Sequence, residues 1–309
     1  MGGMNPRTVN RLMLLVTALL FSTGGAAIKA TQLTSWQVAG FRSAVAAVAV
    51  IVLVPEARRG WNARVLLVAC AYAATLLCFV LANKATTSAN SIYLQGTAPL
   101  YVLALSPWLL HERIRRHDAV FGAVVAAGLV LFFLANEAPV ATAPHPLRGN
   151  ILAAFSGITW ALTLTGMRWL GRQGTSAATA TVVAGNLIAA VAALPFALPV
   201  THAGWNDVAV ILYLGVFQIG LAYFLLTRAI RHVPAFETAT LLMLEPAINP
   251  VWAWLVHGER PGALALGGGS LILGASFFHT WQQSRAERVK ENAHADRACP
   301  APTGPRDPS

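Results

Sequence analysis

Charged side chains are scarce in this sequence. Of its 309 residues, 11% are Asp, Glu, Lys or Arg, while 56% are hydrophobic. An average soluble domain carries about 25% charged residues. A deficit of this size along the whole chain excludes an ordinary soluble globular protein, and it indicates an integral membrane protein whose surface is largely in contact with lipid.

Cysteine and common catalytic motifs are also scarce. The three cysteines, Cys70, Cys78 and Cys299, do not have the pattern of a disulfide framework. The sequence has no glycine-rich Walker loop and no H-E-x-x-H zinc motif. We therefore expect no ATPase activity, no metal site, no cofactor and no catalytic residue.

Long apolar stretches, by contrast, recur along the chain. A helix needs about 20 apolar residues to cross a bilayer core of about 30 Å. Ten stretches approach this length: about 11–30, 36–54, 64–82, 88–110, 119–136, 149–170, 177–199, 207–227, 236–257 and 262–281. The first could be a signal peptide, but nine further stretches favour an uncleaved helix. We predict an all-α integral membrane protein with ten transmembrane helices.

The net charge of +10 is unevenly distributed. With the N-terminus placed in the cytoplasm, 17 of the 22 Lys and Arg residues fall in inner segments and four in outer segments, and Arg42 lies within a stretch. This bias follows the positive-inside rule. We therefore expect a multi-pass protein of the cell (inner) membrane with both termini cytoplasmic, and no binding of nucleic acid.

The chain contains an internal repeat. TAPLYVLALSPWLLHER (97–113) aligns with LEPAINPVWAWLVHGER (244–260), and in each segment a proline stands 13 residues before a Glu-Arg pair. The repeats cover about 1–140 and 145–285, and the composition of the tail, 286–309, predicts disorder in the cytoplasm. Because each repeat has five spans, the second copy must cross the membrane in the opposite sense. Inverted repeats of this kind are typical of secondary transporters that work by alternating access.

These segments resemble the paired domains of the EamA family, within the drug/metabolite transporter superfamily. The similarity is carried by the mid-helix prolines and the terminal Glu-Arg pairs, and it is stronger in FLLTRAIRHVPAFETATLLMLEPAINPVWAWLVHGERP than in its counterpart in the first half. The resemblance implies ten helices in an inverted-repeat bundle. It also implies export of small metabolites or amino acids, and export rests on the resemblance alone.

Glu245 is the first candidate site residue, because a charged side chain near the middle of a span costs about 3 kcal/mol or more. Pro246 next to it should bend the helix and free a backbone carbonyl. Asn249 and Trp252 follow at i+4 and i+7, so they share a stripe with Glu245. Three interpretations stay open: Glu245 contacts substrate, binds a coupling proton, or makes a structural contact with another span.

Arg42 is the second charge inside a span. It lies less than two turns from the outer end, so it could snorkel to the interface or make a structural pair. Alternatively it binds a substrate carboxylate. If Arg42 and Glu245 both face one cavity, the site suits a zwitterion such as an amino acid. If Glu245 acts without Arg42, aromatic walls would favour a multidrug or lipophilic-cation exporter.

Further polar and aromatic side chains near the middle of other spans are secondary candidates for substrate binding: Gln95, Trp160, Gln218 and Tyr223. Each alone is also compatible with a helix–helix contact. Lys29 is expected to anchor the interface, and Glu112 and Glu259 to cap helix ends or form ion pairs. A membrane-embedded enzyme and a channel remain as alternatives to a transporter.

Glycine pairs recur in the last span of each repeat. Gly122 and Gly128 in the first match Gly268 and Gly274 in the second, and small residues let helices approach closely. They indicate packing against a neighbouring helix or a homodimer contact. The expected partners are therefore a small-molecule substrate, the lipid bilayer, a coupling proton and a second copy of the chain.

Overall fold

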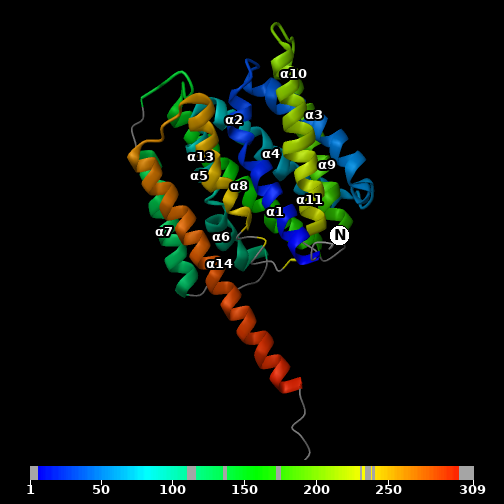
Figure 1. Cartoon of the computed structure of the whole chain (residues 1–309), viewed down its shortest axis with the longest axis vertical. Helices are drawn as coiled ribbons and strands as arrows, with labels where there is room; N and C mark the ends of the chain where they lie inside the picture. Colours follow the sequence, from blue (N-terminus) through cyan, green and yellow to red (C-terminus); the bar gives the residue numbers. More distant parts are fainter. Residues whose placement is uncertain are drawn as a thin grey trace, which may run out of the picture.

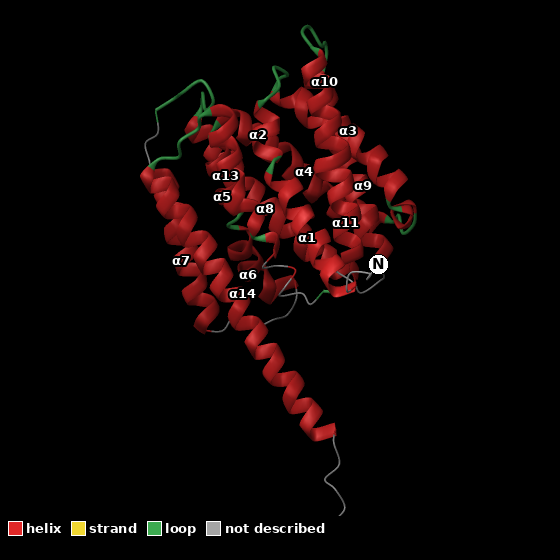
Figure 2. Cartoon of the chain, in the orientation of Figure 1, coloured by secondary structure: helices red, strands yellow, loops and turns green. Residues whose placement is uncertain are grey.

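The computed structural model describes residues 6–109, 116–134, 138–171, 175–229, 232–233, 238 and 241–298. All regular elements in these ranges are helices, and the β-type pairing found there is one isolated bridge between Val140 and Ala143. Figure 2 shows a bundle of helices whose loops gather at its two ends. The all-α prediction is confirmed.

The first half of the chain supplies eight helical elements to the described part. They are α1 (Pro6–Ser22), α2 (Gly24–Lys29), α3 (Ser35–Leu53), the 3-10 turn η1 (Pro55–Arg58), α4 (Ala63–Ala85), α5 (Ser88–Gln95), α6 (Ala98–Leu109) and α7 (Arg116–Leu134). Side chains set several of the starts. Thr34 and Gln37 form a capping box at α3, and Asn62 caps α4 by accepting from the Val65 N–H.

The second half contributes seven described elements. They are α8 (Pro146–Gly171), α9 (Thr175–Ala197), α10 (Trp205–Leu212), the π-helical segment η2 (Tyr213–Leu221), α11 (Ala222–Ala229), α13 (Leu244–His257) and α14 (Ala263–Ala298). Helix α13 ends at Gly258, whose φ of 66° is the left-handed conformation that glycine adopts without strain.

Several of these helices are long and apolar enough to cross a bilayer. Six described stretches meet that standard: Thr8–Lys29, Ser35–Leu53, Ala63–Ala85, Pro146–Met167, Ser176–Ala197 and Trp205–Ala229. Asp118–Leu134 and Ala263–His279 are shorter apolar helices. The expected span 88–110 is divided into α5 and α6, and part of the expected span 236–257 lies outside the described residues. The chain is therefore a multi-pass membrane protein.

The two repeats are interrupted at equivalent positions. Gly96 and Thr97 separate α5 from α6, and a turn at Met243 precedes α13; the alignment of the two prolines places Gly96 opposite Met243. Pro99 and Pro246 therefore lie in the first turn of a new helix, where a missing N–H removes no helical hydrogen bond. We expected a proline kink within one continuous helix, and the structure instead starts a helix there.

Helices α7 and α14 pack side by side (Figure 1), and Gly128 and Gly268 lie at their contact. A Cβ added at Gly128 would lie 2.9 Å from the Gly268 carbonyl oxygen, and one at Gly268 would lie 2.7 Å from the Gly128 oxygen. Both are too close for any other residue. The interpretation as a packing contact within the chain therefore holds for this pair.

Helix α14 continues well past its apolar part. It runs through residues 286–298, which belong to the segment for which composition predicted disorder. Alanine, glutamate, arginine and lysine dominate AERVKENAHADRA, and all four favour helix. In Figure 1 this extension leaves the bundle at the end where the chain starts. Residues 299–309 lie outside the described part.

Candidate functional site

Arg42 is buried in the interior of the bundle. Its side chain is 2% exposed and is the largest of the fully buried side chains. Its Nη2 donates to the Leu76 carbonyl of α4 at 3.3 Å, and its Nε has no hydrogen-bond partner in the described part of the chain. A snorkelling arginine would end at the bilayer surface. The snorkelling alternative is therefore wrong, because the surrounding helices enclose Arg42.

Two tyrosines lie next to Arg42. The hydroxyls of Tyr72 in α4 and Tyr223 in α11 are 3.1 Å apart. The Tyr72 ring contacts Trp160 of α8, with centroids 6.2 Å apart, and the Tyr223 ring meets Phe21 edge-on at 5.5 Å. Tyr223 lies within electrostatic range of both Arg42 and Glu245. We call Arg42, Tyr72, Trp160, Tyr223 and Glu245 the central cluster.

Glu245 lies in the first turn of α13, directly after the turn at Met243. The positive end of a helix dipole at this position favours a negative charge. The side chain is half-buried, and within the described ranges its carboxylate has no hydrogen bond and no ion pair. No structural partner for Glu245 is therefore found there, whereas the substrate and proton interpretations both require an available carboxylate.

Asn249 and Trp252 face the break between α1 and α2. The Asn249 side-chain amide donates to the Ser22 carbonyl at 3.0 Å, and the Trp252 indole donates to the Ser22 hydroxyl at 3.0 Å. Asn249 is 1% exposed, and a Cβ at Gly25 would lie 3.0 Å from its Oδ1. These two side chains thus bind α13 to the end of α1, which sequence reasoning missed because Ser22 carries no motif.

Gln95 and Gln218 lie at separate positions. The Gln95 amide donates to the Ser156 hydroxyl of α8 at 2.6 Å, as a helix–helix contact would. Gln218 belongs to η2 and packs on Gly24, where a Cβ would lie 2.8 Å from its Nε2. Its Oε1 has no partner in the part of the chain that the structure describes. Of the eight candidates, the structure therefore brings Arg42, Trp160, Tyr223 and Glu245 together.

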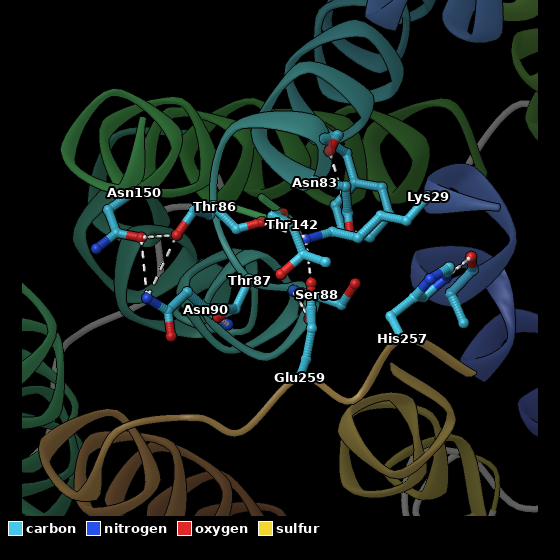
Figure 3. A network of polar contacts seen from close by, with 12 residues as sticks. Lys29, Asn83, Thr86, Thr87, Ser88, Asn90, Thr142, Asn150, His257 and Glu259 are labelled. Atoms are coloured by element: carbon cyan, nitrogen blue, oxygen red, sulfur yellow. Dashed lines mark hydrogen bonds and ion pairs between the residues drawn. The ribbon is translucent and has the colours of Figure 1, made fainter. Parts of the chain in front are cut away.

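Sequence reasoning also missed a polar network, drawn in Figure 3, around the end of α2, which lies at the end of the bundle opposite the chain start in Figure 1. Lys29 forms an ion pair with Glu259, and both side chains are almost fully buried, at 5% and 1% exposure. Lys29 was predicted to anchor the interface, and this prediction is wrong because it is enclosed by protein oxygen atoms. The ion-pair role expected of Glu259 is confirmed. Glu112 lies outside the described residues.

The neighbouring corner between α4 and α5 is held by amides and hydroxyls. The Thr86 hydroxyl lies 2.8 Å from the Asn150 Oδ1 of α8, and the Asn90 amide donates to the same oxygen at 3.2 Å (Figure 3). Thr87 caps α5 by accepting from the Asn90 N–H. The corner is thus fixed to α8 of the second half.

A separate cavity of about 460 Å³ lies between α7 and α14. Its lining is mainly apolar: Val120, Phe121, Val124, Ala275, Phe278, His279 and Gln282. The His279 ring stacks on Phe121 and its Nε2 lies 2.9 Å from Asp118. None of its lining residues belongs to the central cluster.

No group of three or more His, Cys, Asp or Glu side chains suited to a metal ion occurs among the described residues.

Taken together, apolar spans, interrupted helices and a buried cluster shared by both halves define a polytopic membrane transporter. The EamA-like transporter family matches residues 11–134 and 147–281. The chain belongs to this family, as the resemblance implied.

Relatives agree with this assignment. The chain is 27% identical over 279 residues to the pseudopaline exporter CntI of Pseudomonas aeruginosa, covering 85% of this chain and 92% of the exporter. An uncharacterized transporter of Clostridium kluyveri is 27% identical over 93 residues, 30% of each chain. A solved crystal structure superposes with a TM-score of 0.60 at 18% identity, covering 91% of this chain and 99% of the other, and this similarity concerns the fold alone.

Proposed function

We propose that the protein is a secondary transporter that exports amino acids or related small metabolites by alternating access. The observation that carries this proposal is the central cluster. In this cluster a buried guanidinium, without an acidic partner in the described part, lies beside Tyr72 and Tyr223, and Tyr223 also lies near the half-buried carboxylate of Glu245. The related pseudopaline exporter supports the direction of transport.

The chemistry of the cluster favours a zwitterion. A buried charge is costly until a counter-charge and hydrogen bonds compensate it. A substrate carboxylate would supply both to Arg42, whose planar fork suits bidentate binding. The same substrate's ammonium group would pair with Glu245, and the tyrosine hydroxyls would donate to its oxygen atoms.

The proposed topology has ten spans, five in each repeat. The protein lies in the cell (inner) membrane, with both termini in the cytoplasm. The bounds of the repeats are about 1–140 and 145–285. The matching breaks at Gly96 and Met243 support this arrangement, because interrupted helices near the middle of the membrane are typical of transporter binding sites. A proton that binds Glu245 after the substrate leaves would provide the coupling.

The test is protection of cells from toxic amino acids and their analogues. Cells that express the wild-type protein should accumulate less of one such compound, while Glu245→Gln and Arg42→Gln, at matched membrane levels, should not reduce accumulation. Arg58→Gln is the matched control, since Arg58 lies in an exposed turn. Unchanged accumulation with the wild type for every compound tested, together with absence of uptake in vesicles, would contradict export.

A lipophilic cation is the second candidate substrate. Glu245 has no ion pair within the described ranges, and the rings of Phe21, Trp160 and Tyr223 provide aromatic faces for cation–π contacts. The two candidates differ in their need for Arg42. Arg42→Gln should leave efflux of cationic dyes intact and abolish efflux of amino acids.

A further inference from the structure

The ion pair of Lys29 and Glu259 joins distant parts of the chain at one end of the bundle. Lys29 ends α2, and Glu259 follows Gly258 in the loop between α13 and α14. Besides its pair with Glu259, the Lys29 ammonium donates to the Thr86 carbonyl at 2.7 Å and to the Thr142 carbonyl at 2.5 Å. The other oxygen of Glu259 accepts from the Ser88 N–H at 2.9 Å.

These bonds connect two groups of segments (Figure 3). Lys29 and Glu259 belong to α2 and to the loop after α13. Thr86, Ser88 and Thr142 belong to the α4–α5 corner and to the linker between the repeats. The ion pair is thus hydrogen-bonded to backbone groups of the α4–α5 corner and of the linker between the repeats.

Helix α2 and helix α13 are held together independently of this ion pair. His257 lies 2.8 Å from the Ala26 carbonyl, and Asn249 and Trp252 both donate to Ser22 just before α2. Residues 22–29 and α13 therefore form one unit, which we call the α2–α13 unit. If this unit moves away from the α4–α5 corner and the linker, the bonds from Lys29 and Glu259 to Thr86, Thr142 and Ser88 must break.

A buried ion pair is a poor means of stabilising a fold, because desolvation offsets most of the attraction. Its hydrogen bonds do, however, specify one arrangement of the segments that it joins. The Lys29 ammonium uses all three of its N–H groups in hydrogen bonds to oxygen atoms. We expect such a contact to form with all of its bonds or with none.

We propose that Lys29 and Glu259 close the transport pathway on the outer side, by docking the α2–α13 unit onto the α4–α5 corner and the linker. In this structure the contact is closed, and it opens when the protein releases substrate to the outside. The inference rests on the proposed alternating access, and it adds the residues that form the outer gate. The outer side is the one that the positive-inside rule assigns to Lys29.

The first test is a reversible cross-link in a variant whose Cys70, Cys78 and Cys299 are serine. A short disulfide-containing bifunctional reagent that joins cysteines at positions 29 and 142 should lower transport at least tenfold, and a reductant should restore it. The matched control joins positions 26 and 257, which both lie within the α2–α13 unit. This cross-link should leave transport within about twofold of the wild type, because it constrains no contact between the unit and the α4–α5 corner or the linker.

The second test reports opening without any substrate. Ser88 is fully buried, so a Ser88→Cys variant in the same background should react slowly with a membrane-impermeant maleimide added outside. Adding Lys29→Met together with Glu259→Gln removes both charges and leaves no unpaired ion, and it should raise the labelling rate about tenfold. Lys84→Met is the control, because it removes a half-buried ammonium at the same end, which donates to the Thr31 carbonyl.

The outcomes separate the gate from the transport function. Unchanged labelling in the double variant with a native thermal unfolding curve, or full transport by the 29–142 cross-linked protein, would overturn the gate. Faster labelling without transport by any variant, including the wild type, would support the gate and contradict the proposed export.

Discussion

The hydroxyl of Tyr72 lies 3.1 Å from that of Tyr223, and this hydrogen bond joins α4 of the first half to α11 of the second. Arg42 and Glu245 both lie within electrostatic range of Tyr223. Tyr223 therefore lies near both the positive and the negative group of the central cluster, and under the proposed function its hydroxyl would donate to the substrate.

Replacing Tyr223 by phenylalanine should weaken substrate binding and preserve the fold. A hydrogen bond to a charged group contributes about 1.5–3 kcal/mol, so the substrate concentration for half-maximal efflux should rise about 10- to 150-fold. The concentration dependence of efflux measures this. Tyr213→Phe is the control, since Tyr213 has its hydroxyl near Thr23 and away from the cluster. Equal effects of the two changes would speak against a substrate contact for Tyr223.

Replacing Arg42 by methionine should abolish amino acid transport and leave the protein at least as stable as before. The guanidinium is buried without an acidic partner in the described part, so its removal relieves a desolvation cost. Thermal unfolding in detergent measures the stability, and efflux measures the function. A Tm several degrees below the wild type, with or without activity, would show that Arg42 holds the fold together.

Replacing Asn249 by alanine should lower stability, because the buried Ser22 carbonyl loses its donor from α13. Leaving a buried polar group unsatisfied costs about 1–3 kcal/mol. Trp252→Phe, which keeps the ring and loses the indole N–H, should have a smaller effect since the Ser22 hydroxyl also donates to Leu19. The unfolding midpoints of the two variants test this prediction. It is wrong if Trp252→Phe lowers the midpoint more than Asn249→Ala does.

Gly128→Ala and Gly274→Ala should differ although both lie in matching glycine pairs. A Cβ at Gly128 would lie 2.9 Å from the Gly268 oxygen, and such overpacking costs about 1–3 kcal/mol. A Cβ at Gly274 meets nothing within 4 Å, so alanine there should stabilise the helix slightly. Thermal unfolding of both variants decides, and equal loss of stability would contradict the packing described for α7 and α14.

The sequence alone was sufficient to predict the all-helical fold class, the internal repeat and the family. Hydrophobic stretches reveal spans because a bilayer imposes their length, and the spacing from Pro99 and from Pro246 to their Glu-Arg pairs is visible in the chain itself. The break at Met243 was harder to predict. A proline within a long apolar stretch is compatible with a kink or with a new helix, and neighbouring spans determine which occurs.

Arg42 and Glu245 were identified as candidates because each is a charge within an apolar span, and their role in binding stays a prediction. Tyr72 was missed because a tyrosine in a span is common, and its importance comes from Tyr223, which lies 151 positions later. Lys29 was placed at the interface because its sequence position is close to a loop. Only the folded chain reveals that the Thr86 and Thr142 carbonyls and Glu259 surround its ammonium.

The helical extension of α14 determines how far the C-terminal region can reach. The apolar part ends near His279 and the helix ends at Ala298, so at 1.5 Å per residue the remaining helix spans about 28 Å. A fluorescent protein fused after Ala298 would therefore be held at a distance comparable to the bilayer core itself. The extension thus provides a helical attachment point for labels or tethers that lies outside the bundle.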